Sequence, residues 1–314
     1  MQENKKALVL LNMGGARNKD ELKMFLTNMF NDRNILTVKS DLIRKMIAYF
    51  IVSRRLDSAW ENYKHIGNAS PINPLTEKLV EKCNEKIEDY KVYQAMRYTP
   101  PFAKDVIEEI IKDGITNILL LPLYPQFSTT TTKSSVQDFI DYTPYSCKLE
   151  YIEEFYKNRK FNDCIINEII SNVEDASEYN LIFSAHGLPQ KIVDNGDPYE
   201  EQMNEHVGIL KNMLEAKGVN FKSINLAYQS KVGPLKWLEP SLEDMLKNFK
   251  EQKVIIYPIA FIVDNSETDF ELDIEYREVA HDLGVKEYKV CRCVNDSDDF
   301  IEAIKDIIKG HKWE

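Results

Sequence analysis

One histidine stands at the end of an apolar run that has the length and composition of a buried strand. The range 179–183 is rich in Leu, Ile and Phe, and it is followed by Ser184-Ala185-His186-Gly187, where the chain must turn. Ligands of open α/β sheets bind beyond the carboxyl ends of the strands, so His186 is a candidate binding or catalytic residue. A histidine that is only hydrogen-bonded at a sheet edge is the alternative, and spacing favours neither.

A group of carboxylates follows another strand-like run, Val254–Ile259. Glu267, Glu271 and Glu275 are spaced four residues apart, so they share one face of a helix, where like charges destabilise by roughly 0.2–0.5 kcal/mol each. For Glu271 and Glu275, a solvated acidic face and a path for cations are both open. Glu267 lies nearest the strand end and in the same domain as His186, which makes it the stronger functional candidate.

Eight strand-like runs alternate with amphipathic helical segments, which predicts a mostly parallel, doubly wound α/β architecture. The expected strands are Ala7–Leu11, Tyr90–Ala95, Ile118–Leu123, Leu149–Ile152, Leu181–Phe183, Ile224–Ala227, Val254–Ile259 and Tyr288–Val290. They divide into two sets of four. We therefore expect two Rossmann-like domains, residues 1–165 and 166–314, each with a four-stranded parallel sheet flanked by helices. The last helix could pack back on the first domain.

Bulk composition narrows the class of protein. The 314 residues are 43% hydrophobic and 29% charged, as in a soluble globular protein, and the formal charge of −11 argues against a nucleic-acid partner. No apolar run is long enough to span a membrane, and the N-terminal residues do not form a signal peptide, so we expect a cytoplasmic protein. Five scattered cysteines predict free thiols in a reducing compartment.

Two glycines follow the first strand, in Asn12-Met13-Gly14-Gly15-Ala16. The dinucleotide fingerprint is not completed, so the sequence excludes an NAD site here. The glycines instead allow a ligand to approach the backbone closely. Further on, residues 41–60 carry more apolar side chains than one buried helix face needs, flanked by arginines and lysines. That mixture suits a core helix with solvated ends, or a surface that meets anionic lipid or a hydrophobic ligand.

Motifs along nearly the whole chain resemble those of the ferrochelatases, class II chelatases that insert ferrous iron into a porphyrin to make haem. The matching segments are Ser184-Ala185-His186-Gly187-Leu188-Pro189 with Asn195-Gly196-Asp197-Pro198-Tyr199, Met96-Arg97-Tyr98, Leu121-Pro122-Leu123-Tyr124-Pro125-Gln126, Gln229-Ser230-Lys231-Val232-Gly233-Pro234, and Glu271-Leu272-Asp273-Ile274-Glu275-Tyr276. Each motif is weak alone, but together they occur in the family's order and at similar separations.

The resemblance implies a lyase, a chelatase-like fold and the last step of haem synthesis, with Fe²⁺ and protoporphyrin IX as substrates. His186 and Glu267 would be the catalytic and metal-binding pair. The resemblance assigns porphyrin binding to Met13, Arg55, Tyr63, Ser70, Arg97, Tyr98, Tyr124, Ser128 and Trp237. Met13 points to protoporphyrin, because a tyrosine there marks relatives that use coproporphyrin. Residues 41–60 match the family's porphyrin lip, which implies peripheral contact with the inner face of the plasma membrane.

No cofactor is expected, since iron is a substrate and the cysteines that hold an iron–sulfur cluster in some ferrochelatases are missing from the C-terminal residues. An imidazole with an ordinary pKa near 6.5 can accept a pyrrole proton or bind a metal. Imidazole and carboxylate ligands suit Fe²⁺ without selecting it over cobalt or zinc.

The chain departs from the family pattern at several positions, and two other functions stay open. Ala16 replaces a proline, Asn68 and Ala69 replace glycines, Lys133 replaces a glycine, and Asn265 replaces a frequent histidine. A sirohydrochlorin cobaltochelatase-like enzyme would share the fold. A haem or porphyrin carrier without catalysis would keep only the binding cleft, but it would need neither His186 nor Glu267.

Overall fold

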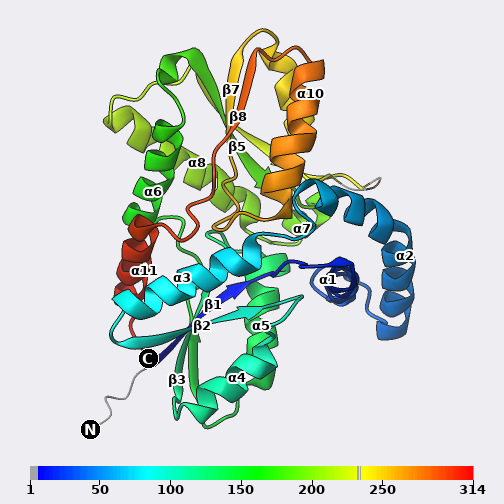
Figure 1. Ribbon diagram of the computed structural model, residues 1–314, viewed down its shortest axis with the longest axis vertical. Coiled ribbons are helices and arrows are strands. Elements are labelled where there is room, and N and C mark those ends of the chain that lie inside the picture. The colour runs from blue at the N-terminus through cyan, green and yellow to red at the C-terminus, as the bar shows by residue number, and fades with distance from the viewer. Residues whose placement is uncertain (1–5, 232, 234, 314) are drawn as a thin grey trace. The chain divides into compact units, whose positions relative to one another are not determined.

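The structure is a computed structural model that describes residues 6–231, 233 and 235–313 (Figure 1). It contains two four-stranded sheets, and all strand pairs within them are parallel. The chain divides into two compact units. The first comprises residues up to Tyr124, Ser128–Glu153 and the residues from Lys309 onward, and the second comprises Pro125–Phe127 and Glu154–Ile308. The predicted class of fold is therefore confirmed.

The first unit is built on the sheet β2-β1-β3-β4. Its strands are β1 (Lys6–Asn12), β2 (Tyr90–Met96), β3 (Asn117–Pro122) and β4 (Lys148–Tyr151). Its helices are α1 (Lys19–Asn31), α2 (Asp41–His65), α3 (Ile72–Lys86), α4 (Ala103–Lys112), the short π-helix η1 (Thr129–Lys133) and α5 (Ser134–Tyr142). The predicted strands in this unit agree with the observed ones to within two residues at either end.

Side-chain alternation along β1 explains how this sheet is covered. Ala7, Val9 and Leu11 belong to the apolar cluster that the sheet forms with α4 and α5. Successive residues of a strand point to opposite faces, so the equally buried Leu8 and Leu10 lie on the other face. With both faces covered, the central strand β1 is apolar from Ala7 to Leu11, as is common for strands inside parallel sheets.

The second unit repeats this topology in the sheet β6-β5-β7-β8. Its strands are β5 (Tyr179–His186), β6 (Ser223–Gln229), β7 (Lys253–Tyr257) and β8 (Glu287–Val290). The helices are α6 (Arg159–Ser171), η2 (Ala176–Glu178), α7 (Gln190–Asp194), α8 (Tyr199–Ala216), α9 (Leu242–Leu246), η3 (Lys247–Phe249), the π-helix η4 (Glu267–Glu275), α10 (Tyr276–Asp282) and α11 (Asp298–Gly310).

One face of the second sheet packs against α9, η4 and α10. Ile182 of β5, Val254 and Ile256 of β7 contribute to this cluster, and Leu272 enters it from η4. Because Leu272 is completely buried, η4 is anchored to the sheet by its apolar side. The acidic side chains of the same helix are therefore available at the carboxyl end of the sheet, where Glu267 meets His186.

The contacts divide the chain at Glu153/Glu154, whereas the sequence placed the division at 165/166. Helix α6 joins the second unit because its polar and aromatic side chains meet α8 there: Asn162 bonds to His206 at 2.7 Å. The last helix, α11, also belongs to the second unit as far as Ile308, with Phe300 packed on Phe161. The residues from Lys309 onward are assigned to the first unit.

The loop after α2 keeps its shape although two family glycines are replaced. Gly67 and Asn68 have φ angles of 83° and 67°, in the left-handed region. Asparagine tolerates that region better than other non-glycine residues, because its short side chain can bond locally. Asn68 therefore substitutes for a glycine at modest cost, and the loop returns the chain to Ser70 and α3.

Candidate active site

His186 is the last residue of β5, the central strand of the second sheet. Its side chain is 38% exposed, whereas the rest of the strand is buried. The following residue must be glycine, because a Cβ at Gly187 would lie 2.7 Å from the Gln229 carbonyl oxygen and 3.3 Å from the Trp237 ring. The strand end is thus held tightly, and the imidazole is presented at the edge where ligands bind in such sheets.

A carboxylate meets this imidazole directly. His186 Nδ1 lies 2.8 Å from Glu267 Oε2, and the Glu267 side chain is 25% exposed. Burial acts most strongly and lowers the pKa of His186, but the charge of Glu267, its hydrogen bond to the ring and the charge of Glu271 together outweigh burial and raise that pKa to about 9. Burial acts to raise the pKa of Glu267, and the His186 charge turns the net shift downward. Both groups are therefore charged near neutral pH.

The second glutamate of the same helix joins the pair through a serine. Ser230 Oγ donates to Glu271 Oε2 at 2.6 Å and lies 3.3 Å from Glu267 Oε2. Burial and the Glu267 charge raise the pKa of Glu271 to about 7. Ser230 has a φ of 66°, a backbone conformation that costs about 1–3 kcal/mol outside glycine and tends to persist at functional sites. That turn aims its hydroxyl at both carboxylates.

Gln229 fixes the other side of Glu267. Its amide nitrogen lies 3.3 Å from Glu267 Oε2, while its amide oxygen accepts a bond from Ser184 Oγ at 2.7 Å. Because the serine donates to the oxygen, the amide orientation is set and its N–H₂ faces the carboxylate. Ser184 is itself in β5, two residues before His186. Hydrogen bonds therefore connect β5 through the Gln229 amide to the Glu267 carboxylate.

The glutamates project from a π-helix, a rare form that is frequent at functional sites. Asn265 caps its start: the side-chain oxygen accepts from the Glu267 backbone N–H at 2.8 Å, and the amide nitrogen donates to the Val263 carbonyl at 3.1 Å. Asn265 is completely buried. The residue that replaces the family's histidine therefore positions the backbone of Glu267, not its carboxylate.

A second histidine of the same unit illustrates the purely structural alternative. His206 is completely buried, with Nδ1 2.7 Å from the Gln126 amide nitrogen and Nε2 2.7 Å from Asn162 Oδ1. Burial lowers its pKa to about 3, so the ring is neutral. Both of its nitrogens are occupied. For His186, the described residues provide a partner for Nδ1 only, which leaves Nε2 to a ligand.

Most residues that the resemblance assigns to the porphyrin lie in the first unit, and many are buried. The five with a relative exposure of 9% or less are Tyr63, Ser70, Tyr98, Tyr124 and Ser128. The four that retain accessible surface are Met13, Arg55, Arg97 and Trp237, of which Trp237 belongs to the second unit. Met13 follows β1, Arg97 follows β2 and Tyr124 follows β3, so these three share the carboxyl edge of the first sheet.

Arg97 is bound by side chains of its own unit. Its Nη2 lies 3.1 Å from Asp32 Oδ2, its Nη1 3.2 Å from Asp138 Oδ1, and its Nε 2.9 Å from Ser134 Oγ. Arg55, on the outer part of α2, is exposed, and its guanidinium has no ion pair among the described residues. A guanidinium without an ion pair can bind a carboxylate through two nitrogens. Arg55 is therefore better suited than Arg97 to bind a propionate, because the nitrogens of Arg97 are already occupied.

Helix α2 exposes a row of apolar side chains. The large ones with more than half of their surface accessible are Leu42, Ile43, Met46, Tyr49 and Phe50. Ile47 and Ile51 are partly exposed on the same helix, and Ile51 also packs on the cluster between α1 and α2. No helix of the described residues is long and apolar enough to cross a membrane.

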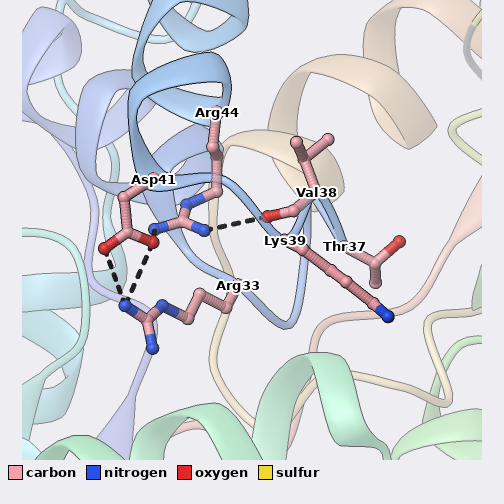
Figure 2. A pocket seen from close by; sticks show the side chains of 6 residues that line it. All are labelled: Arg33, Thr37, Val38, Lys39, Asp41 and Arg44. Atoms are coloured by element: carbon pink, nitrogen blue, oxygen red, sulfur yellow. Dashed lines mark hydrogen bonds and ion pairs between the residues drawn. The ribbon is translucent and has the colours of Figure 1, made fainter.

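An open cavity of about 490 Å³ lies beside the start of α2 (Figure 2). It is lined by Arg33, Thr37, Val38, Lys39, Asp41 and Arg44. Arg33 Nη2 and Arg44 Nη2 both approach Asp41 at 2.8 Å, and the Arg44 fork also donates to the Val38 carbonyl (Figure 2). Lys39 points away from this group, so the cavity combines one carboxylate with three cationic side chains.

No group of three or more His, Cys, Asp or Glu side chains is arranged to hold a metal within the described residues. The five cysteines are free thiols, as predicted, and four of them are buried. Burial raises the pKa values of Cys164, Cys291 and Cys293, which keeps these thiols protonated. His186 and Glu267 could therefore bind a metal only together with ligands from elsewhere.

The sequence pointed to His186 and Glu267, and the structure brings them together. It did not identify Gln229 and Ser230 as partners of Glu267, although both lie in a quoted motif. It also gave no sign of Asp32, Ser134 and Asp138 around Arg97. A lone aspartate after a helix and a serine at the start of another are ordinary surface residues by pattern, so only the fold could show that they meet.

Comparison with known proteins agrees with these motifs. The family model Ferrochelatase matches residues 5–312. A protein named ferrochelatase from Sulfurimonas denitrificans is 53% identical over 309 residues, covering 96% of this chain and 98% of the relative. Ferrochelatase of Helicobacter pylori strain J99 is 43% identical over 316 residues, covering 99% and 94%.

Solved structures of similar fold are more distant in sequence. SirB from Bacillus subtilis with Fe³⁺ superposes with a TM-score of 0.61 at 11% identity, covering 97% of this chain and 94% of that one. CbiX, described as the terminal enzyme for biosynthesis of sirohaem in denitrifying bacteria, gives 0.51 at 10% identity, covering 98% and 100%. These two establish the chelatase-like fold. The family model and the curated relatives extend over almost the whole chain, and the chain belongs to the ferrochelatase family.

Proposed function

We propose that this protein inserts Fe²⁺ into protoporphyrin IX to form protohaem. Membership of the ferrochelatase family carries the reaction class, and the 2.8 Å contact between His186 and Glu267 carries the assignment of the reacting residues. Iron is a substrate of this reaction. Insertion releases two protons from the pyrrole nitrogens, so the site must deliver one divalent cation and accept two protons.

His186 is the proposed metal ligand and proton acceptor. Glu267 occupies Nδ1, so Nε2 is the nitrogen that meets iron or a pyrrole N–H. The carboxylate stabilises the charged form of the imidazole and raises its pKa to about 9, so His186 must first release the proton on Nε2 before that nitrogen can bind iron or accept a pyrrole proton. Iron must displace a proton from Nε2 to bind there. The ion pair therefore couples the arrival of the metal to the departure of a proton.

Glu271 is the proposed second proton carrier. Its pKa of about 7 lets it exchange protons near neutral pH, where an acid–base group works best. Ser230 Oγ lies 2.6 Å from Glu271 Oε2 and 3.3 Å from Glu267 Oε2, so this hydroxyl bridges the two carboxylates and gives a short route from the reacting pair to the acidic face of η4. Glu275 follows on that helix and is exposed.

Porphyrin binding is proposed for the nine residues of the family pattern in two roles. Met13, Arg55, Arg97 and Trp237 have accessible surface and are proposed to contact the macrocycle or its propionates. The buried members, Tyr63, Ser70, Tyr98, Tyr124 and Ser128, are proposed to shape the binding surface from below. Met13 supports protoporphyrin over coproporphyrin, because the family's coproporphyrin branch has tyrosine at this position.

We propose no resident cofactor and no iron–sulfur cluster. A cluster is held by thiolates, and the buried thiols of Cys164, Cys291 and Cys293 have raised pKa values that keep them neutral. Absorption spectra and iron and sulfide analysis of anaerobically purified protein test this proposal. A sulfide-containing chromophore in stoichiometric amount would overturn it.

The decisive experiment mixes purified protein with Fe²⁺ and protoporphyrin IX without oxygen and follows the absorption spectrum. Conversion of the free-base bands to those of haem is expected, and the H186A variant should not convert. Parallel reactions with coproporphyrin III and with sirohydrochlorin plus Co²⁺ identify a different substrate. Tight porphyrin binding with no turnover for any metal would instead show a carrier.

We also propose that α2 contacts an anionic membrane surface at the cytoplasmic face. Its exposed apolar side chains, among them Leu42 and Phe50, belong to the helix whose first turn lines a cavity together with the cationic Arg33 and Lys39 (Figure 2). An interfacial helix binds by this combination of apolar area and positive charge. Sedimentation with liposomes should show binding to anionic vesicles that weakens in M46S/F50S, while I111S, an equally exposed change elsewhere in the first unit, should bind as wild type. Equal loss in both variants would contradict a specific surface.

A further inference from the structure

Asp32 occupies an unusual position at the end of α1. It is the C-cap residue of that helix, and its side chain is only 1% exposed. One oxygen, Oδ1, accepts from the Asn34 backbone N–H at 2.8 Å. The other, Oδ2, accepts from the Tyr98 hydroxyl at 3.0 Å and from the Ser134 hydroxyl, and it pairs with Arg97 Nη2 at 3.1 Å.

This one carboxylate joins three elements of the first unit. Asp32 ends α1, Tyr98 and Arg97 follow β2, and Ser134 begins α5. A buried ion pair is a poor source of stability, because desolvation offsets most of the attraction and an apolar contact of similar size does as well. Its bonds are directional, however, so it can fix the place of each partner. The segments that contact Arg97, Tyr98 and Ser134 are therefore the ones whose position depends on Asp32.

The partners of Asp32 support the turn that follows β1. The Arg97 backbone N–H donates to the Asn12 carbonyl at 2.8 Å, and that of Tyr98 donates to the Met13 carbonyl at 3.0 Å. Contact behind the turn is equally close, since a Cβ at Gly14 would lie 2.2 Å from Thr99 Oγ1. Any shift of the segment after β2 must therefore move the turn that carries Met13.

Other contacts hold the same segment from the α1 side. The Asn28 amide donates to the Tyr98 carbonyl at 3.0 Å, and the Phe25 ring meets the Tyr98 ring edge-on with centroids 5.6 Å apart. These contacts fix Tyr98 but leave the Arg97 guanidinium to its carboxylates. Asp138, the second partner of Arg97, is 21% exposed and bonds less extensively than Asp32.

From this geometry we infer that Asp32 is a positioning residue for porphyrin recognition. It holds Arg97 and Tyr98, and through their backbone it sets the place of Met13. The inference rests on the proposed function, because Met13 and Arg97 are taken there to meet the macrocycle. Asp32 itself touches no reacting atom, so its loss should weaken porphyrin binding and leave the iron chemistry largely intact.

The test is a double-mutant cycle with D32N, R97Q and D32N/R97Q. Affinity for protoporphyrin IX is measured without iron by quenching of its fluorescence, and kcat and KM are measured with iron. We expect D32N to raise Kd and KM for porphyrin about tenfold, the scale of one hydrogen bond to a charged group, with kcat within threefold of wild type. Since Asp32 acts in part through Arg97 and in part through Tyr98, the double variant should bind more weakly than R97Q alone but by less than the product of the two single effects.

The matched control is D141N, an exposed aspartate of α5 that should bind porphyrin as wild type. An unchanged Kd in folded D32N, or effects of D32N and R97Q that simply add, would overturn the inference and leave Asp32 a structural residue. If D32N does not fold, Y98F replaces it: loss of that hydroxyl should raise Kd severalfold at unchanged kcat, and an unchanged Kd would overturn the inference equally. Wild type that neither binds nor metallates porphyrin would refute the proposed function instead.

Discussion

The two sheets repeat one topology, and each carboxyl edge groups one basic side chain with two carboxylates, but that side chain is an arginine at the first edge and a histidine at the second. At the edge of the first sheet, Arg97 is neutralised by Asp32 and Asp138, and its nitrogens are occupied. At the edge of the second, His186, Glu267 and Glu271 meet with no arginine or lysine bonded to them among the described residues. A network whose donors are all occupied can hold a binding surface in place, whereas the second edge leaves His186 Nε2 open to a ligand.

This difference shows that the fold determines where functional residues gather but not which reaction they carry out. Parallel strands gather the residues that follow them at one edge, and the loops decide the chemistry. At the second edge, the neutral side chains of Ser230 and Gln229 bond to the carboxylates without adding positive charge, so His186 is the one basic group bonded to them among the described residues. Variants at the first edge should therefore impair porphyrin binding, and variants at the second edge should impair iron insertion.

The largest effect is expected for H186A. Removal of the metal ligand and proton acceptor should lower kcat by roughly 10²–10⁴, the range for general acid–base groups, and leave porphyrin Kd within a few-fold. Anaerobic turnover and fluorescence quenching measure the two quantities. The control is H281A, in the same unit, whose side chain is 89% exposed. A loss of porphyrin affinity in parallel with the loss of activity would contradict the assignment of recognition to the first edge and of reaction to the second.

E267Q should come next and should also change the pH dependence. The pKa of His186, about 9 in the pair, should fall toward its ordinary value of 6.5 once the carboxylate charge is gone. In wild type, kcat/KM for iron should therefore rise with pH up to about 9, because protonated Nε2 cannot bind the metal. In E267Q, that rise should end at lower pH, with a lower plateau, while E275Q should follow wild type.

The same ion pair predicts the pH dependence of stability. A histidine with a raised pKa stabilises the folded state fully below about 6.5, and this contribution disappears as pH rises through about 9. Glu267, whose pKa is lowered, contributes above its ordinary value of 4.5 and less as pH falls below it. The excess free energy of unfolding of wild type over E267Q should thus be greatest between these limits. Urea unfolding at several pH values measures it, and a difference independent of pH would contradict the ion pair.

Particular residues show which parts of the fold and of the site could be predicted from the sequence. The apolar run before His186 predicted β5, and its abrupt end predicted the histidine at the sheet edge. The spacing of Glu267, Glu271 and Glu275 placed their carboxylates on one face of a helix, but it could not distinguish the π form that the structure shows. Asp32 meets Ser134 across 102 positions of sequence, a contact that no local pattern contains.

A smaller effect is expected for N265A. Its side chain accepts the Glu267 backbone N–H, so alanine removes the cap of η4, worth about 0.5–2 kcal/mol. Activity should fall about tenfold, equivalent to about 1.4 kcal/mol, through misplacement of Glu267. N265S can still cap and should recover most of the loss. A loss as large as that of H186A would show that position 265 takes part directly in the chemistry.

The smallest effect is expected at the first edge, in M13Y. The side chain of Met13 is partly exposed, while its backbone is tied on both sides, the N–H to Asn12 Oδ1 at 2.8 Å and the carbonyl to Tyr98. A tyrosine should therefore change the binding surface and not the turn. One side chain in a pocket commonly changes discrimination between related substrates by about tenfold or more, and a position that meets only part of the ring should fall at the lower end of that range. We expect the ratio of kcat/KM for protoporphyrin over coproporphyrin to fall by several-fold, with the pH profile unchanged because His186 and Glu267 belong to the other sheet. M13L is the matched control and should keep the wild-type ratio. A shifted pH profile in M13Y would mean that the first edge reaches into the proton chemistry, and the separation of recognition from reaction would then not hold.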